Sequence, residues 1–107
     1  MSDLAKTGKL KMSNQQLLRG ENLFLKQDNV TQKGISRIYK FDNEYGASVI
    51  MNDISYGGKS GLYEVAVLDN DGDLCFDTKI TNDVLGFLTP PEVNVILENI
   101  SNLSPKT

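Results

Sequence analysis

The sequence contains no histidine and only one cysteine, Cys75. Histidine is the commonest general base and zinc ligand, and it activates the nucleophile of most serine and cysteine hydrolases. A lone cysteine excludes an internal disulfide, so nothing indicates an oxidising compartment. Carboxylates and lysines can still catalyse reactions, but these absences favour a protein that is not an enzyme. We expect no catalytic residue, no cofactor and no metal.

Long apolar runs are also missing. No stretch is long enough to span a bilayer, and the N-terminus lacks the apolar core of a signal peptide. The 107 residues are 39% apolar and 23% charged, which is typical of one globular domain. We therefore expect a single cytoplasmic domain with no membrane contact.

The net charge of −3 hides an asymmetry. Residues 1–40 carry eight Lys or Arg and three Asp or Glu, a net of +5, whereas residues 41–107 carry three and eleven, a net of −8. Such an asymmetry can direct binding to a charged partner, or can attract the two parts to each other within the fold. We expect a flexible basic arm at 1–12, a domain at 13–104 and a tail at 105–107. The arm holds three lysines for contact with nucleic acid or an acidic partner: Lys6, Lys9 and Lys11.

A helix is predicted to begin at Ser13, because Ser13 and Gln16 have the spacing of a capping box. The short apolar run at 23–25 also fits a strand, since brief apolar runs do not distinguish the two structures, and both interpretations stay open. The polar segment 27–34 is expected to be a connector.

The middle of the chain predicts antiparallel strands. At 61–78, strand-like residues on both sides of Asp-Asn-Asp-Gly-Asp predict a central hairpin, with a tight turn at Asp71-Gly72. The strand before that turn has one polar residue, Glu64, which predicts that it is covered on both faces or lies inside its sheet. A glycine-rich loop, 52–61, precedes the hairpin. Four strands are expected in all, at 35–42, 47–51, 62–68 and 74–78.

The C-terminal part predicts helix. Residues 81–88 fit a short turn capped by Thr81 or Asn82. Thr89-Pro90-Pro91-Glu92 is the clearest helix start, with Thr89 as N-cap and Glu92 completing a capping box. The helix then carries an apolar stripe that excludes Asn94, Glu98 and Asn99 and consists of Val93, Ile96, Leu97, Ile100 and Leu103. The predicted fold is α+β: a four-stranded antiparallel meander with the C-terminal helix packed on one face and an N-terminal helix against an edge or the other face.

Two motifs resemble functional sites and then depart from them. Gly58-Lys59-Ser60 resembles the end of a phosphate-binding loop, but position 53 is Asp where that loop needs glycine, and strand-like sequence follows where it needs a helix. Asp69, Asp71 and Asp73 alternate as in an EF-hand, but the sixth position is Leu74 and the twelfth is Ile80. These patterns favour loop and turn chemistry, with a weak cation site at the hairpin tip as the alternative.

Cys75 is flanked by Leu74 and Phe76 and is expected to be a small core residue. Both loops are accessible surfaces in this prediction, so we select them, together with the basic arm, as candidates for partner binding. The candidate residues are Tyr56, Lys59, Asp69, Asp71, Asp73, Lys6, Lys9 and Lys11.

The central block contains Tyr-Gly-Ala-Ser-Val-Ile at 45–50, Ser-Tyr-Gly-Gly at 55–58, Gly-Leu-Tyr-Glu-Val-Ala-Val-Leu at 61–68, Asp-Gly at 71–72, Asp-Thr at 77–78 and Ile-Thr-Asn-Asp-Val-Leu-Gly-Phe-Leu-Thr at 80–89. Through these residues, about 35–100 of the chain resembles small accessory proteins of tailed bacteriophages and prophages. The resemblance implies origin more than activity: those members of this group that are understood often bind and redirect a host protein, which would take place in the host cytoplasm.

Three functions are therefore expected in order of preference. The first is a non-enzymatic protein that binds, and modulates or inhibits, a host protein such as a defence or nucleic-acid enzyme. The second is a nucleic-acid-binding protein that uses the basic N-terminal third. The third is a virion or assembly component that acts as a homo-oligomer.

Overall fold

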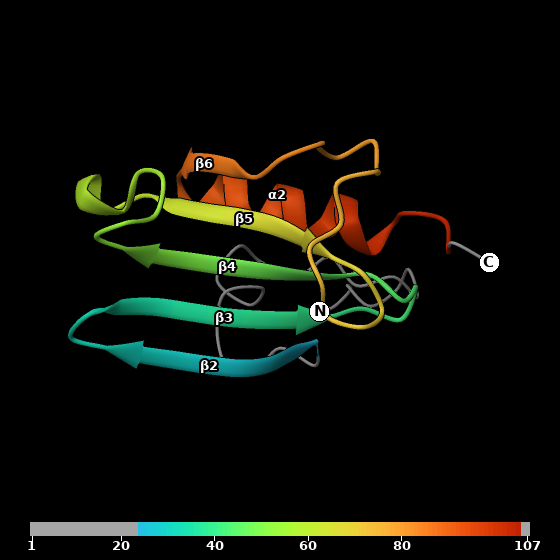
Figure 1. Ribbon diagram of the computed structural model, residues 1–107, viewed down its shortest axis with the longest axis horizontal. Coiled ribbons are helices and arrows are strands. Elements are labelled where there is room, and N and C mark those ends of the chain that lie inside the picture. Colours follow the sequence, from blue (N-terminus) through green and yellow to red (C-terminus); the bar gives the residue numbers. More distant parts are fainter. Residues whose placement is uncertain (1–23, 106–107) are drawn as a thin grey trace, which may run out of the picture.

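The computed structural model describes residues 24–105. They form one antiparallel sheet of five strands in the order β2-β3-β4-β5-β6, with helix α2 on one face (Figure 1). The elements are β2 (Leu25–Thr31), β3 (Gly34–Lys40), β4 (Gly46–Asn52), the short 3₁₀ helix η1 (Gly58–Ser60), β5 (Tyr63–Leu68), β6 (Leu85–Leu88) and α2 (Pro90–Ser101). The α+β class is therefore confirmed, and the strand count is five instead of four.

The sheet is a meander, since each strand pairs with its neighbour in the chain. Side chains alternate across it, as they must in pleated strands. On the helix side, Tyr39 lies beside Ala47 and Ala47 beside Val67, and all three are buried in the core. On the opposite side, Ile38, Ser48 and Ala66 form the next row. The strand at β5 is indeed interior to the sheet, as its sequence predicts.

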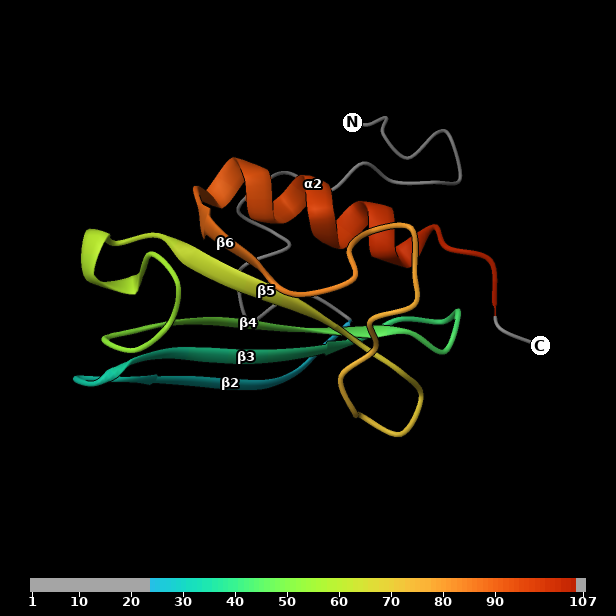
Figure 2. The same cartoon turned by 45° about the horizontal axis from the view of Figure 1, so that its top comes forward.

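Helix α2 begins and packs as the sequence predicts. The Thr89 side chain accepts from the Glu92 backbone amide, and the Glu92 carboxylate accepts from the Thr89 amide at 2.8 Å, which completes the capping box. Helix α2 lies over the sheet (Figure 2), and its main contacts are with β4 and β5. The fully buried members of its apolar stripe are Val93, Leu97, Ile100 and, just past the helix, Leu103. Each such side chain contributes about 1.5–3 kcal/mol before conformational entropy is subtracted.

Asn94 corrects the expectation that it lies outside the stripe, because only 3% of it is exposed. It follows Val93 by about 100° around the helix, and the buried arc is wide enough to include it. Its Nδ2 donates to the Pro90 carbonyl at 3.0 Å, while Oδ1 has no partner. The buried Tyr39 hydroxyl is the other side-chain group without a partner within residues 24–105, and burial raises the pKa of Tyr39 to about 12.

Three secondary-structure predictions were wrong. The expected connector at 27–34 is mostly β2, whose exposed polar residues show no apolar pattern because it is an edge strand paired only with β3. The expected strand at 74–78 is reduced to one bridge, Leu68 to Leu74, followed by a bond from the Cys75 amide to the Val67 carbonyl. The expected helical turn at 81–88 instead contains β6 at Leu85–Leu88, because that strand pairs with the open side of β5.

The predicted arm at 1–12 and the predicted helix from Ser13 lie outside the described residues, as do residues 106 and 107. Phe24 directly precedes β2; its carbonyl accepts from the Lys40 amide at 2.9 Å, and the centroid of its ring lies 5.4 Å from that of Phe41.

Candidate functional site

The sequence-selected loops lie at opposite ends of β5 (Figure 2). The loop that contains Tyr56 and Lys59 precedes the strand, and the loop that contains Asp69, Asp71 and Asp73 follows it. The structure therefore does not bring these two groups into one site. The third group, Lys6, Lys9 and Lys11, lies outside residues 24–105.

The first loop is built by reciprocal hydrogen bonds at the end of β4. The Asn52 side chain accepts from the amides of Ile54 and Ser55, and the Ser55 hydroxyl donates back to the Asn52 carbonyl at 3.0 Å. A side chain at Gly58 would overlap that same carbonyl, so the loop requires glycine there. Gly58–Ser60 then makes one 3₁₀ turn that runs into β5, with Lys59 exposed.

This loop then docks on β6. The Phe87 amide donates to the Tyr56 carbonyl at 3.1 Å, and the Tyr56 amide donates to Glu64 Oε1 at 2.9 Å. Gly86 lies directly beneath the Tyr56 side chain, and the backbone of Gly57 lies against that of Phe87. These contacts fix the Tyr56 backbone, yet 60% of the residue stays exposed.

Phe87 is the functional candidate that sequence reasoning missed. It lies in the edge strand β6, is 62% exposed and has a positive φ of 56°. A left-handed backbone is costly for a bulky residue and tends to mark functional positions when the surroundings hold it in place. No local sequence motif identifies Phe87, because the Tyr56 loop that contacts it is distant in sequence.

An apolar groove lies where β6 meets α2. It is open, has a volume of about 340 Å³ and is lined by Leu88, Pro91, Glu92, Val95 and Ile96. Val95 is 56% exposed although it lies on a helix that packs into the core. We call Tyr56, Phe87, Leu88, Val95 and Ile96 the apolar edge.

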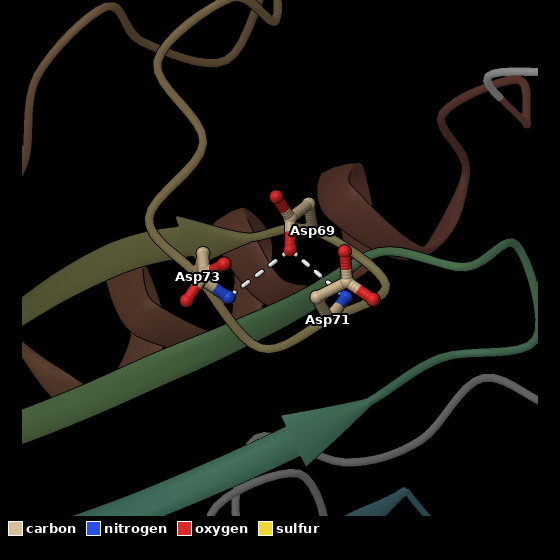
Figure 3. Close-up of side chains that lie close together, drawn as sticks. All are labelled: Asp69, Asp71 and Asp73. Carbon is tan, nitrogen blue, oxygen red and sulfur yellow. Dashed lines mark hydrogen bonds between the residues drawn. The ribbon is translucent and has the colours of Figure 1, made fainter.

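The second loop has a different character (Figure 3). Oδ1 of Asp69 accepts from the backbone amides of Asp71 at 2.9 Å and Asp73 at 3.0 Å, and the Asp69 amide donates to the Asp73 carbonyl at 2.8 Å. One carboxylate oxygen from each of the three aspartates falls within 4.8 Å of the others, which makes them the candidate cation ligands of residues 24–105. The bonds of Asp69 are those of an Asx turn, so turn formation already accounts for this spacing.

Cys75 is buried, and its thiol donates to Asp77 Oδ1 at 3.0 Å. Its predicted role as a small core residue is confirmed. Its neighbours Leu74 and Phe76 are exposed on the same loop, away from the apolar edge.

Within residues 24–105, no helix has the length and apolar character that crossing a membrane requires. Comparison of the chain with protein-family models, with curated proteins and with solved structures found no match.

Proposed function

We propose that this protein is a non-enzymatic interaction domain that binds another protein through the apolar edge. The observation that supports this most directly is the position of two exposed aromatic residues, Tyr56 and Phe87, on backbones joined by a hydrogen bond. Large aromatic side chains supply most of the binding energy at many protein interfaces. Phe87 directly precedes Leu88, which lines a groove that offers further apolar surface.

The edge is also held in shape before any partner arrives. Backbone amides of the Tyr56 loop donate to the side chains of Asn52 and Glu64, and the Phe87 amide donates to the Tyr56 carbonyl. A rigid surface loses little conformational entropy on association, so more of the contact energy is available for affinity. Lys59, on the same loop as Tyr56, is exposed and adds a positive charge to that loop.

The partner in this proposal is a host protein in the cytoplasm of a bacterium, which the protein modulates or inhibits. The resemblance of residues 35–100 to phage accessory proteins supports that choice. Nucleic acid is a weaker partner for the described part, because residues 24–105 carry six Lys or Arg and twelve Asp or Glu, a net charge of −6. That charge repels phosphates.

The test compares partner recovery by matched variants. Tyr56→Ser removes an aromatic side chain from the apolar edge, and Leu74→Ser removes a side chain of similar exposure, 55%, from the other loop. We expect a host protein recovered by the wild type to be lost with Tyr56→Ser and retained with Leu74→Ser. Equal recovery by both variants would show that the partner binds elsewhere.

A further inference from the structure

We infer that the groove between β6 and α2 takes a partner segment in which a large apolar side chain stands next to a lysine or arginine. This inference rests on the proposed function and specifies the chemistry of the partner. Three features of the groove support it: its apolar walls, its single carboxylate and the charge around it.

The apolar part of the recognition comes from four side chains. Leu88 of β6 forms one wall, and Pro91, Val95 and Ile96 of α2 form the other. Ile96 packs against the core on one side, so the groove floor is continuous with a rigid interior. An aliphatic or aromatic side chain that enters would bury apolar surface on both walls, which is the dominant favourable term in association.

The charged part comes from Glu92, which is the one charged residue lining the groove. Oε1 of Glu92 accepts from both the amide and the hydroxyl of Thr89, at 2.8 and 3.0 Å, so the carboxylate is held in one orientation. The backbone hydrogen bond from Thr89 also lowers the pKa of Glu92, which keeps it ionised at neutral pH. Oε2 makes no hydrogen bond with residues 24–105, so it has acceptor capacity left for a partner.

The surrounding charge favours the same partner. Residues 80–105, which include both walls of the groove, contain Asp83, Glu92 and Glu98 and no lysine or arginine. Lys59 belongs to η1 and does not line the groove. A cation that enters the groove therefore meets Glu92, and none of the described residues lining the groove is a lysine or arginine. Complementary charge raises the rate and the selectivity of association.

Strand addition to β6 is a less suitable way to bind here. The strand has four residues, and its register with β5 is irregular between Tyr63 and Val65. Short and bulged edges resist pairing with another strand. The partner in this inference is therefore recognised by its side chains and not by its backbone.

The experiment titrates the full-length, isotope-labelled protein with two short synthetic peptides and follows backbone amide signals by NMR. One peptide alternates leucine and arginine between glycine-serine ends, and the other has glutamate in place of arginine. We expect the leucine-arginine peptide to shift the amide signals of Leu88, Val95 and Ile96, with an affinity that falls as salt is added. The leucine-glutamate peptide should bind at least about tenfold more weakly, because it adds like-charge repulsion to a lost attraction.

Three variants test the two halves of the recognition. Glu92→Gln removes the charge and keeps the capping box, which accepts Gln at this position, so we expect about a two- to fivefold loss of affinity for the arginine peptide. Glu98→Gln, on the same helix but outside the groove, should leave the affinity within error. Val95→Asn conserves helix propensity and should weaken binding of both peptides, with an unchanged circular dichroism spectrum.

Several results would overturn the inference. These are equal binding of the two peptides, an unchanged affinity in Glu92→Gln, no shift of the groove signals, or shifts of those signals on simple dilution, which would identify a second copy of the chain as the occupant. In each case the partner-recovery comparison of Tyr56→Ser and Leu74→Ser still stands as a separate test of the proposed function.

Discussion

Strand β5 leads out of one exposed loop and into another, and the two loops are held by different kinds of contact. The loop at 69–73 closes mainly on itself, because most of its hydrogen bonds join residues two to four positions apart. One longer-range bond is added by Lys40 Nζ, which donates to the Asn70 carbonyl at 3.4 Å. The loop at Asp53–Leu62 depends on other parts of the chain, since Glu64 and Phe87 hold Tyr56 in place. The turn at 69–73 therefore exposes carboxylates to solvent, whereas the Tyr56 loop and β6, which are distant in sequence, form one surface together.

This difference separates what could be predicted from the sequence and what could not. The Asp-Gly turn and the start of α2 at Thr89 are local structures, and their signals lie within a few residues, so both predictions are confirmed. β6 is different, because residues 85–88 are strand only where β5 offers an open edge. Phe87 adopts its left-handed backbone where the Tyr56 loop contacts β6. No pattern in the sequence reports that contact, so Tyr56 was a predicted candidate and Phe87 was not.

Burial on a helix flank is a further case. Val93 and Leu97 could be placed in the core by their spacing, but the width of the buried arc depends on how the sheet meets the helix. Asn94 lies inside that arc, and its polar side chain predicted the opposite. β2 was missed for a related reason, since an exposed edge strand needs hydrogen bonds more than it needs apolar side chains.

The largest expected effect compares one glycine from each loop. Gly57 and Gly72 have similar positive φ values, 92° and 84°, so alanine is strained at both by about 1 kcal/mol. A Cβ at Gly57 would also lie 2.8 Å from the Phe87 Cα, while a Cβ at Gly72 would meet nothing within 4 Å. We expect Gly57→Ala to lower the free energy of unfolding by about 3 kcal/mol and Gly72→Ala by about 1 kcal/mol, measured by urea denaturation. Equal losses would mean that the first loop does not dock on β6.

The next effect concerns the loop at 69–73 alone. Asp69→Ala leaves the amides of Asp71 and Asp73 without their acceptor, and we expect a loss of about 1–2 kcal/mol in the same denaturation experiment. Asp69→Asn keeps an acceptor oxygen and should cost about 0.5 kcal/mol or less. A large loss for Asn would point to the carboxylate charge, and hence to a bound cation, as the source of stability.

The smallest effect compares glycine with alanine at one exposed position from each end. At Phe87, with φ of 56°, we expect Phe87→Gly to be more stable than Phe87→Ala by about 1 kcal/mol, because glycine tolerates the left-handed region. At Leu74, which does not have a positive φ, we expect the reverse order, with Leu74→Gly less stable by about 0.5–1 kcal/mol. If the alanine variant is the more stable at both positions, the Phe87 backbone is not strained.

The meander has a consequence for how easily each part of the molecule opens. Residues 53–62 are the longest connection among β2 to β5, whereas residues 69–84 separate β5 from β6. Closing that longer segment has a larger entropic cost, and β6 pairs with β5 at two positions in return, Leu85 with Val65 and Leu88 with Tyr63. The β6 amides should therefore exchange with solvent through partial openings that leave the other four strands paired. A partner that binds the apolar edge would slow amide exchange in β6. This slower exchange would report binding even if the exchange rates of the other strands do not change.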